Sequence, residues 1–599
     1  MARPAARYAP LLIALAAACD DSPGLAPHAD QLLDGGLIGP GLCSGNWCWS
    51  NPIPQGNNLG GVWGSSATDV WVVGEVGTIL HWDGGEWNAV ASGVSSDLHS
   101  VWGVKSNDVW AVGNDWTLLH WDGSAWNATA SDVKNVSLTS VWGSATDDIW
   151  AVSTQGKALH YNGSAWTATT INTATSFTGV WSSSAKDVWA VGGGGAAYHY
   201  DGTKWTLVAS GTDKSLYAVW GSGPSDVWAV GDAGIIVHWN GTAWSRDASN
   251  KATARLRSIS GTGPKDVWAI GETGVVTHWN GTAWTVGTTT STALFHGIWA
   301  ASATELWAVG DTGALYHSSA TAWNAFSSGA TVSLHGIWGS GPTDIWAVGD
   351  SGTTLRLQGT TWKSVTSATS KKLNGVWGSA ANDVWAVGEG GVIVHWDGTK
   401  WALAPSTTAN ILLGVFGTSA NDVWVVGASG IALHWQGKVW TAVPTAQTKT
   451  FHAVWASSAT DVWAAGDGST VIRWDGVSWK KVDVAGANTG FTLRSIWGSS
   501  SSDIYFTAGA QAGFHWDGHA LTTGVGAGNA VWGMSSTDVW IAGDVGGTSH
   551  LSAADATHTA PFWTPYASGT TNALQALWGS STNDVWAAGD TGTILHWQK

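Results

Sequence analysis

The chain has 599 residues, of which 80 are glycine, 49 are tryptophan and only 11% are charged. Long helices need Ala, Leu, Glu and Lys in quantity, whereas Gly, Ser, Thr, Val and Trp are typical of strands and tight turns. The formal net charge of −17 comes with only 25 Lys and Arg. This composition disfavours nucleic acid as a partner, because a phosphate backbone is bound by a basic surface.

Residues 1–18 predict an export signal of the lipoprotein type. Two arginines precede the apolar run 9–18, which is too short to span a bilayer. The string Leu15-Ala16-Ala17-Ala18-Cys19 resembles the bacterial lipobox, in which the cysteine is lipidated. This resemblance implies that a lipid on Cys19 is the only membrane attachment and that the protein lies at the outer membrane or cell surface. The alternative is an ordinary secretory signal and a periplasmic or secreted protein.

Residues 19–42, rich in Gly, Pro, Asp and Leu without periodicity, predict a flexible tether. Cys43 and Cys48 follow, five positions apart. In an exported protein they predict a local disulfide. The other ligands of a two-cysteine metal site are missing here, so no metal is predicted.

Self-comparison shows fourteen units in register. The unit that begins at residue 59 reads LGGVWGSSATDVWVVGEVGTILHWDGGEW. Its first aromatic position recurs every 39 or 40 residues until Trp455 and then at intervals of 42, 35 and 46, at Trp63, Trp102, Trp142, Trp181, Trp220, Ser260, Trp299, Trp338, Trp377, Phe416, Trp455, Trp497, Trp532 and Trp578. A fixed period in this range indicates a solenoid, a propeller or an array.

Each unit divides into four short strand-like runs, A to D, bounded by turn residues. Strands C and D are joined by Asp-Gly or Asn-Gly, as at Asp83-Gly84 and Asn240-Gly241, which suits a two-residue hairpin. Four hairpin-linked strands in about 40 residues are typical of a β-propeller blade. The sequence therefore predicts an all-β protein of fourteen four-stranded blades, with tryptophan filling the space between blades.

Propellers usually have four to eight blades, so two tandem seven-bladed rings are expected, with one fourteen-bladed ring as the alternative. The expected boundaries are 43–319 and 320–599, because unit 7 lacks the C–D hairpin turn at residues 317–321. In this threading, the strand around Trp49 closes the first ring. The strand at Trp323 closes the second ring against the C-terminus.

The repeats resemble several propeller families. The His-Trp-Asp-Gly-x-x-Trp endings are similar to those of tectonin-type lectins and, more loosely, of WD-repeat blades. The Ser-x-x-Asp-Val-Trp run resembles the Asp-box (BNR) repeats of sialidase-like and photosystem-assembly-factor-like propellers. The segment from Asn46 to Pro52, with the blades after it, resembles Trp-rich repeat lipoproteins of myxobacteria. These resemblances imply a propeller fold and carry over no sialidase activity, because the Gly-x-x-Trp ending of the Asp-box is missing.

Two polar positions recur in the blades and are interpreted as structural. An acidic residue opens strand B in all fourteen units, as Asp in thirteen and as Glu305 in one. A histidine in strand C recurs in twelve units, with Arg356 and Arg473 in the other two. Because catalysis needs one asymmetric site, a feature of every blade favours architecture, with the histidine bonded to the aspartate of its own blade.

Acidic residues in the turns between strands B and C occur in only some units. In a propeller, these turns share a face with the connections from strand D to the next strand A, where this sequence varies most. Variable loops on a rigid scaffold are common binding sites. That face is therefore the candidate ligand surface, although solvated turn residues are an alternative reading for each position: Glu75, Asp232, Glu272, Asp311, Asp350, Glu389, Asp467, Asp544 and Asp590.

The sequence matches none of the enzyme templates tested: it has no nucleophile elbow, phosphate loop or zinc-protease helix. It favours a surface-anchored, non-catalytic protein that binds a glycan or another cell-surface ligand. A protein-interaction scaffold in the cell envelope is the alternative, and a carbohydrate-active enzyme is a lower one. No cofactor is expected, although calcium is considered. The expected partner is a glycan or an envelope protein.

Overall fold

The computed structural model describes residues 43–44, 46–51, 55–85, 87–130, 136–289, 291–319, 322–325, 332–358, 361–482, 490–510, 513–553 and 562–598. The predicted signal peptide, Cys19 and the predicted tether lie outside these residues. Within the part of the chain that is described, no helix has the length and apolar character needed to cross a membrane.

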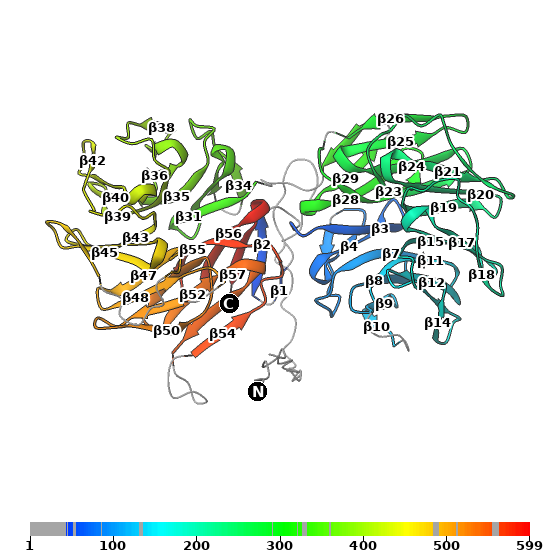
Figure 1. Ribbon diagram of the computed structural model, residues 1–599, viewed down its shortest axis with the longest axis horizontal. Coiled ribbons are helices and arrows are strands. Elements are labelled where there is room, and N and C mark those ends of the chain that lie inside the picture. The colour runs from blue at the N-terminus through cyan, green and yellow to red at the C-terminus, as the bar shows by residue number, and fades with distance from the viewer. Residues whose placement is uncertain are drawn as a thin grey trace, which may run out of the picture. The chain divides into compact units, whose positions relative to one another are not determined.

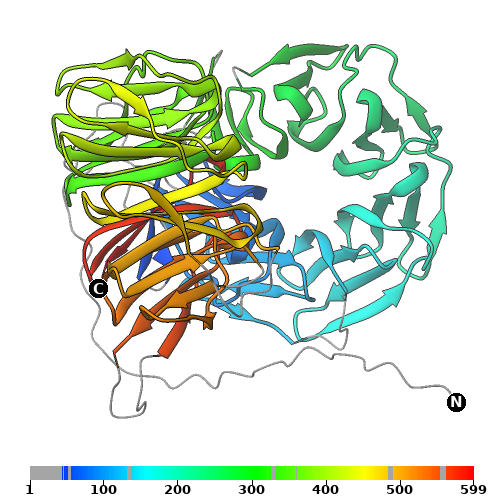
Figure 2. The same cartoon turned by 60° about the vertical axis from the view of Figure 1, so that its left-hand side comes forward.

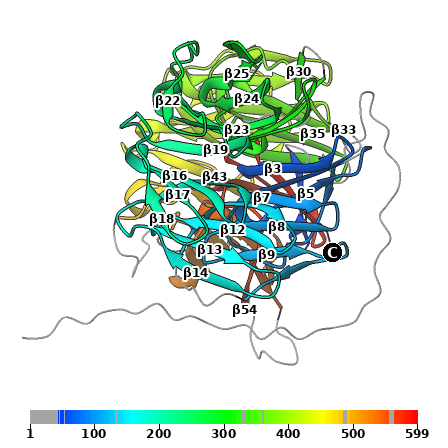
Figure 3. The ribbon, with the colours of Figure 1, turned by 90° about the vertical axis from the view of Figure 1, so that its right-hand side faces the viewer.

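The described chain is built from fourteen antiparallel sheets, which confirms the expected all-β fold of fourteen blades. Thirteen sheets have four strands, and the last has five. In each blade the Leu-x-x-Val-Trp run forms the innermost strand A, and strands B, C and D follow outward. Figure 3 shows β14, β18 and β22, three of the strands D, toward the outside of their sheets.

The strands of blades 1 to 7 have the following bounds. Blade 1 has β3 (Leu59–Ser66), β4 (Asp69–Gly74), β5 (Ile79–Trp82) and β6 (Trp87–Ala89); blade 2 has β7 (Leu98–Lys105), β8 (Asp108–Gly113), β9 (Leu118–Trp121) and β10 (Trp126–Ala128); blade 3 has β11 (Leu138–Ala145), β12 (Asp148–Ser153), β13 (Lys157–Tyr161) and β14 (Trp166–Thr170); blade 4 has β15 (Phe177–Ser184), β16 (Asp187–Gly192), β17 (Ala197–Tyr200) and β18 (Trp205–Leu207); blade 5 has β19 (Leu216–Gly223), β20 (Asp226–Gly231), β21 (Ile236–Trp239) and β22 (Trp244–Arg246); blade 6 has β23 (Leu256–Gly263), β24 (Asp266–Gly271), β25 (Val275–Trp279) and β26 (Trp284–Thr288); blade 7 has β27 (Phe295–Ser302), β28 (Glu305–Gly310), β29 (Leu315–Ser319) and β30 (Ala322–Ala325).

Blades 8 to 14 continue the series. Blade 8 has β31 (Leu334–Gly341), β32 (Asp344–Gly349), β33 (Thr354–Gln358) and β34 (Thr361–Ser364); blade 9 has β35 (Leu373–Ala380), β36 (Asp383–Gly388), β37 (Ile393–Trp396) and β38 (Trp401–Ala404); blade 10 has β39 (Leu412–Ser419), β40 (Asp422–Gly427), β41 (Ala432–Trp435) and β42 (Trp440–Ala442); blade 11 has β43 (Phe451–Ser458), β44 (Asp461–Gly466), β45 (Thr470–Trp474) and β46 (Trp479–Lys481); blade 12 has β47 (Ser495–Ser500), β48 (Asp503–Thr507), β49 (Gly513–Trp516) and β50 (Leu521–Val525); blade 13 has β51 (Ala530–Ser535), β52 (Asp538–Ala542), β53 (Thr548–Ser552) and β54 (Phe562–Tyr566); blade 14 has β55 (Leu574–Ser581), β56 (Asp584–Gly589), β57 (Ile594–Gln598), β2 (Trp47–Asn51) and β1 (Cys43–Ser44).

Most B–C connections form a single 3-10 turn. These turns are η1 (Glu75–Gly77), η2 (Gly193–Gly195), η3 (Asp232–Gly234), η4 (Glu272–Gly274), η5 (Asp311–Gly313), η6 (Asp350–Gly352), η7 (Glu389–Gly391), η8 (Ala428–Gly430), η9 (Asp467–Ser469), η10 (Asp544–Gly546) and η11 (Asp590–Gly592). The second and third residues of each turn have positive φ angles. The third residue is glycine in ten of the eleven, because glycine adopts this conformation without strain.

The N-terminal strand completes the last blade. Strand β2 pairs with β57, with Trp47 opposite Trp597, and Figure 1 shows β2 in blue beside β57 in red. Strand β30, which holds Trp323, pairs instead with β29 of its own blade. The expected threading, and with it a boundary between residues 319 and 320, is therefore wrong. The missing Asp-Gly turn was misleading, because β29 and β30 pair without one.

Neighbouring innermost strands pack against each other in two closed series. In the first, β3, β7, β11, β15, β19, β23 and β27 follow one another, and β27 packs against β3. In the second, β31, β35, β39, β43, β47, β51 and β55 do the same, and β55 packs against β31. We call blades 1–7 the first set and blades 8–14 the second set. Figure 2 shows the blue, cyan and green sheets of the first set standing around a common centre.

Tryptophans of strands B and D join most blades to the next. The ring of Trp126 in strand D of blade 2 meets that of Trp71 in strand B of blade 1 edge-on, with centroids 5.4 Å apart. The same contact joins Trp87 to Trp307, which closes the first set, at 5.2 Å. Trp362 and Trp586 close the second set at 5.9 Å. Edge-to-face pairs of this kind are favourable beyond the area that they bury.

The strand A tryptophans form a second series of contacts nearer the centre. Eleven of the twelve lie against the glycine that follows this position in strand A of the next blade, where a Cβ atom would clash. The twelfth, Trp142, meets Ser182 in that place, and its indole Nε1 donates to the Ser182 carbonyl at 3.2 Å. A Cβ at Gly103 would lie 2.7 Å from Cη2 of Trp63. The pairs are Trp63–Gly103, Trp102–Gly143, Trp181–Gly221, Trp220–Gly261, Trp299–Gly64, Trp338–Gly378, Trp377–Gly417, Trp455–Gly498, Trp497–Gly533, Trp532–Gly579 and Trp578–Gly339.

At two further positions strand A has no tryptophan, and the next blade carries alanine in place of the glycine. Where strand A carries Ser260, the next blade carries Ala300, whose N–H donates to the Ser260 hydroxyl at 3.2 Å. Where strand A carries the smaller Phe416, the next blade carries Ala456, and both belong to one apolar cluster. At these two positions a larger residue replaces the glycine where the neighbouring aromatic ring is smaller or missing.

We expect Gly103→Ala to lower the free energy of unfolding by about 1–3 kcal/mol, because the new methyl group overlaps the ring of Trp63. Gly223→Ala is the control, since a Cβ at Gly223 meets no atom within 4 Å. Urea unfolding followed by circular dichroism measures both. Equal midpoints for the two variants would show that this packing does not limit residue size.

We expect Trp47→Ala to destabilise blade 14, because Trp47 is 1% exposed and lies 5.7 Å from Trp540 and 5.6 Å from Trp597 between ring centroids. Removing a buried tryptophan costs about 3–5 kcal/mol. Hydrogen exchange should become faster in β57 and remain unchanged in β29. Faster exchange in β29 would contradict the observed strand pairing.

Candidate functional site

The recurring strand B carboxylates are used within their own blades. In blade 3, Asp148 Oδ1 lies 2.8 Å from Nε2 of His160 and accepts a 2.9 Å hydrogen bond from the indole Nε1 of Trp150. Asp148 Oδ2 accepts from the hydroxyl of Ser144. The His160 ring stacks on Trp150, with centroids 4.1 Å apart. The expected bond between the strand C histidine and the aspartate of its own blade is confirmed.

The two arginine substitutes preserve this arrangement. Arg356 Nε donates to Asp344 at 2.6 Å, and its guanidinium lies 5.0 Å from the ring centroid of Trp346. Arg473 makes the same two contacts, at 2.5 Å to Asp461 and 5.2 Å from the Trp463 ring. A planar cation thus replaces the imidazole in both its hydrogen bond and its stacking.

The pKa of several strand B carboxyls is lowered by their hydrogen bonds, although these carboxyls are partly buried. Burial alone raises the pKa of Asp187, but hydrogen bonds from His199 and Ser183 and the charge of His199 outweigh it, so the pKa of Asp187 is below its usual value. The same balance lowers the pKa of Asp148, Asp226 and Asp422. These carboxyls are therefore ionised near neutral pH as part of the fold.

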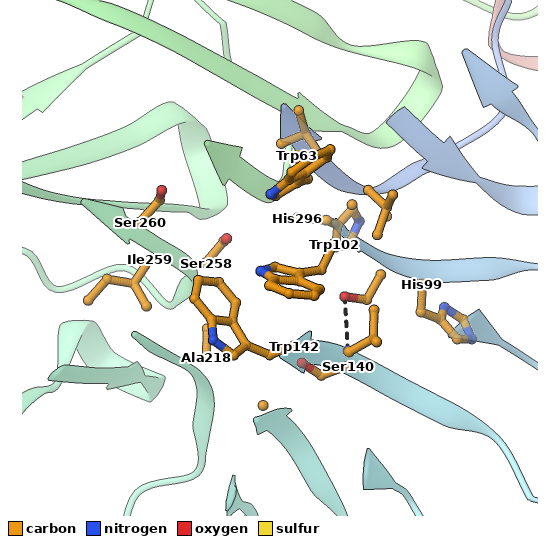
Figure 4. Close-up of a pocket in the computed structure, with 18 of the residues that line it drawn as sticks. Trp63, His99, Trp102, Ser140, Trp142, Ala218, Ser258, Ile259, Ser260 and His296 are labelled. Carbon is orange, nitrogen blue, oxygen red and sulfur yellow. Dashed lines mark hydrogen bonds between the residues drawn. The ribbon is translucent and has the colours of Figure 1, made fainter. Parts of the chain in front are cut away.

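A central cavity of about 150 Å³ lies among the innermost strands of the first set. Figure 4 shows Trp63, Trp102 and Trp142 together with Ser258, Ser260 and His296 around it. The second set has a corresponding cavity of about 370 Å³. One position lines the cavity in every blade and changes from blade to blade; it is the second residue of strand A in twelve blades and the residue just before strand A in blades 12 and 13. Its occupants are Gly60, His99, Thr139, Thr178, Tyr217, Arg257 and His296 in the first set, and His335, Asn374, Leu413, His452, Arg494, Asn529 and Gln575 in the second.

Most of the predicted B–C turn acids contact one of these cavity-lining residues. Strands A and B are antiparallel, so the B–C turn of a blade lies at the end where strand A begins. The contacts within one blade are His296–Asp311 at 2.7 Å, His335–Asp350 and His452–Asp467 at 2.9 Å, Tyr217–Asp232 at 3.1 Å, Asn529–Asp544 at 2.8 Å, Gln575–Asp590 at 3.3 Å and Arg257–Glu272 at 3.5 Å. Glu75 instead accepts a 2.9 Å hydrogen bond from Asn58, and Glu389 is exposed.

The most asymmetric part of this face joins blades 5 and 6. We call Tyr217, Asp232, Arg255, Arg257 and Glu272 the blade 5–6 cluster. Arg255 bridges two of the predicted acids, with Nε 2.5 Å from Asp232 and Nη1 3.0 Å from Glu272. The Arg257 guanidinium lies 4.9 Å from the ring centroid of Tyr217. Burial and the hydrogen bond to Asp232 raise the pKa of the Tyr217 hydroxyl.

The cluster borders a groove of about 460 Å³ lined by residues 211–214, Asp232, Ala233, Ile235 and Arg246. Residues of the D–A connection before blade 5 and of the B–C turn η3 therefore form one surface. Two of the nine predicted acids, Asp232 and Glu272, meet here. The arginines and Tyr217 were not predicted, although the variable second position of an otherwise constant strand A was a usable signal.

The other predicted site residues are distributed as follows. Cys48 is disulfide-bonded, and strand pairing places the backbone of Cys43 opposite it. Among the described residues, no group of three or more His, Cys, Asp or Glu side chains is arranged to hold a metal ion. The predicted acids are spread over nine blades. Asp232, Asp350 and Asp467 also contact Arg255, Lys372 and Thr492 in the connection to the next blade.

No known protein family and no curated protein matches the sequence. Among solved structures, the GH74 enzyme of Niastella koreensis is 12% identical over 92% of this chain and 99% of its own, with a TM-score of 0.61. PorZ, a surface component of the type-IX secretion system of Porphyromonas gingivalis, is 11% identical over 92% of this chain and 87% of its own, with a TM-score of 0.66. YCF48 bound to a D1 peptide covers 47% of this chain and 99% of its own at 18% identity, but its TM-score of 0.39 is too low to support an inference. At these identities, the first two show the propeller-like fold alone.

The lowered aspartate pKa values predict loss of stability in acid. A carboxyl whose native pKa lies below its unfolded value stabilises the fold above about pH 4, and this contribution is lost as the pH falls through the native pKa. The urea midpoint should therefore fall between about pH 5 and pH 2, and Asp187→Asn should make the dependence shallower. Asp213→Asn, at a side chain that is 90% exposed, should leave it unchanged. A midpoint that does not vary with pH would contradict this account.

Proposed function

We propose that this protein is a non-catalytic binding protein of the cell envelope. It is held by a lipid on Cys19 and recognises a glycan through the face formed by its B–C turns and D–A connections. The fold likeness to a glycoside hydrolase and to a secretion-system surface component is compatible with this role. The observation that carries the proposal is the blade 5–6 cluster beside its groove.

The blades form two seven-bladed propellers in this proposal. It is supported by the packing of β27 against β3 and of β55 against β31, and by the two separate central cavities. The rigid blades then act as a scaffold, and the variable positions at the end where strand A begins supply the recognition.

The cluster offers the hydrogen-bonding groups that carbohydrate recognition uses. Arg255 and Arg257 each keep part of their side chain exposed, at 36% and 25%, and Asp232 and Glu272 do the same at 29% and 32%. Tyr217 adds an aromatic ring beside them. Planar donors and acceptors next to an aromatic surface suit a polyhydroxylated ligand.

The recurring carboxylates have another role. Each strand B carboxylate that the structure describes is bonded to the histidine or arginine of its own blade, and this supports assigning them to architecture. The asymmetric cluster therefore stands out from fourteen similar blades. A single distinctive patch also suits a protein partner, which makes an envelope scaffold the second candidate function.

A glycan array and polysaccharide pull-downs with the purified protein, with and without calcium, test the proposal. Saturable binding to one sugar class is expected, together with at least a tenfold loss, roughly 1.4 kcal/mol, in the double variant Tyr217→Phe, Arg257→Ala. Lys265→Ala is the control, since this exposed lysine lies in blade 6 at the opposite, A–B end. A folded protein that binds no glycan would refute the proposal, and cross-linking in the envelope would then test the scaffold.

A further inference from the structure

Trp116 departs from the pattern of the other tryptophans. It is 40% exposed and is the one tryptophan among the described residues that is classed as exposed. It lies in the B–C turn of blade 2, between β8 and β9, on the proposed ligand face. No other aromatic ring stacks on it within the described part of the chain.

The backbone at Trp116 is strained. Its φ angle is +53°, and that of the preceding Asp115 is also +53°. Aligned turns have glycine at this position, as at Gly77 and Gly234, with φ of +66° and +67°. A bulky residue with positive φ is rare because its side chain clashes with the backbone, and strain of this kind gathers at functional sites.

The length of the facing D–A connection differs in blade 2. A Cβ at Gly77 or Gly234 would lie only 2.0 Å from a carbonyl oxygen of the facing D–A connection. In blade 2 that connection, between β10 and β11, is one residue longer than the one between β6 and β7. The N–H of Trp116 donates to the carbonyl of Val136, within this connection, at 2.8 Å.

The turn that carries Trp116 is held by polar contacts. Asp115 is exposed, and its Oδ2 accepts a 3.1 Å hydrogen bond from the hydroxyl of Ser96. Asn114 donates to Asp97 at 3.1 Å, and its Oδ1 lies 2.9 Å from Nε2 of His99. His99 lines the central cavity, so Asn114 links this turn to a cavity-lining residue.

This environment favours a sugar over a protein partner. Aromatic anchors of protein interfaces are enclosed by near-neutral contacts that exclude water, whereas Trp116 directly follows the polar residues Asn114 and Asp115 in its turn. An indole provides a flat apolar surface for the C–H face of a pyranose ring, and carboxylate and amide groups bind its hydroxyls. Asp97 and Asp115 repel an anionic sugar, which makes a neutral sugar the better fit.

We propose that Trp116 is a stacking platform for a neutral pyranose residue, with Asp115 and Ser96 binding its hydroxyl groups. This inference rests on the proposed glycan-binding function and names a binding residue and a ligand class for it. The strained backbone holds the ring in the exposed position, and the hydrogen bonds of Asn114 hold the turn.

Isothermal titration calorimetry of the purified protein with cello-, chito-, malto- and xylo-oligosaccharides tests this inference, with oligogalacturonides as the anionic comparison. Trp116→Gly should weaken binding of the preferred neutral oligosaccharide by at least roughly tenfold. It should leave the thermal midpoint unchanged or raise it, because glycine relieves the positive φ. Trp116→Phe should retain measurable affinity, because it keeps a flat aromatic ring.

Val545→Gly is the matched control, because Val545 is 72% exposed and has φ of +54° in the aligned turn of blade 13. It should bind like the wild type. If the wild type binds a neutral oligosaccharide and Trp116→Gly binds it equally well, the inference is wrong while the proposed function stands. If the folded wild type binds no glycan in the array or by calorimetry, both are wrong. A preference for oligogalacturonides would overturn the assignment to neutral sugars.

Discussion

Contact between tryptophans of adjacent blades is the interaction on which the rest of this structure depends. A blade of four short strands has two apolar faces and buries neither alone. In most blades the strand B ring meets the strand D ring of the next blade, and nearer the centre eleven strand A rings lie over a glycine of the neighbouring blade. Residue sizes are matched at the two joints where a smaller residue replaces the strand A tryptophan, as Ser260 with Ala300 and Phe416 with Ala456 show.

The same packing explains the polar residues that recur. Each strand B tryptophan is covered on one face by the histidine or arginine of strand C, which is held in place by the strand B carboxylate. A buried carboxylate requires several hydrogen bonds, and the serine hydroxyl, the indole N–H and the histidine supply them in blade 3. Function is therefore left to positions where the blades differ, at the end where strand A begins.

The fold was predictable from the sequence because the same four-strand pattern recurs in fourteen units. The blade, its four strands and the structural role of the aspartate–histidine pairs all follow from spacing and turn residues. The threading was not predictable, since a missing Asp-Gly turn at residues 317–321 suggested a break where β29 and β30 pair normally. Even the choice between Trp47 and Trp49 as the ring opposite Trp597 required the strand register.

The candidate site was predictable only in part. The B–C turn acids pointed to the correct end of the blades, but charge alone could not tell that Asp232 and Glu272 share Arg255 while Asp311 and Asp350 bond to histidines of their own blades. The sequence did not single out Trp116 among the 49 tryptophans, because its positive φ angle and its exposure are known only from the structure.

The pairing of β2 with β57 constrains the order in which the protein can fold during synthesis. Strand β2 is synthesised before any complete blade, whereas its partner β57 is synthesised after all the intervening blades. Until then β1 covers only one edge of β2, and the other edge is open to any extended chain that approaches. Contacts between residues so distant in sequence form slowly. The open edge of β2 is therefore a site for wrong pairing throughout synthesis, unless another protein covers it until β57 has been made.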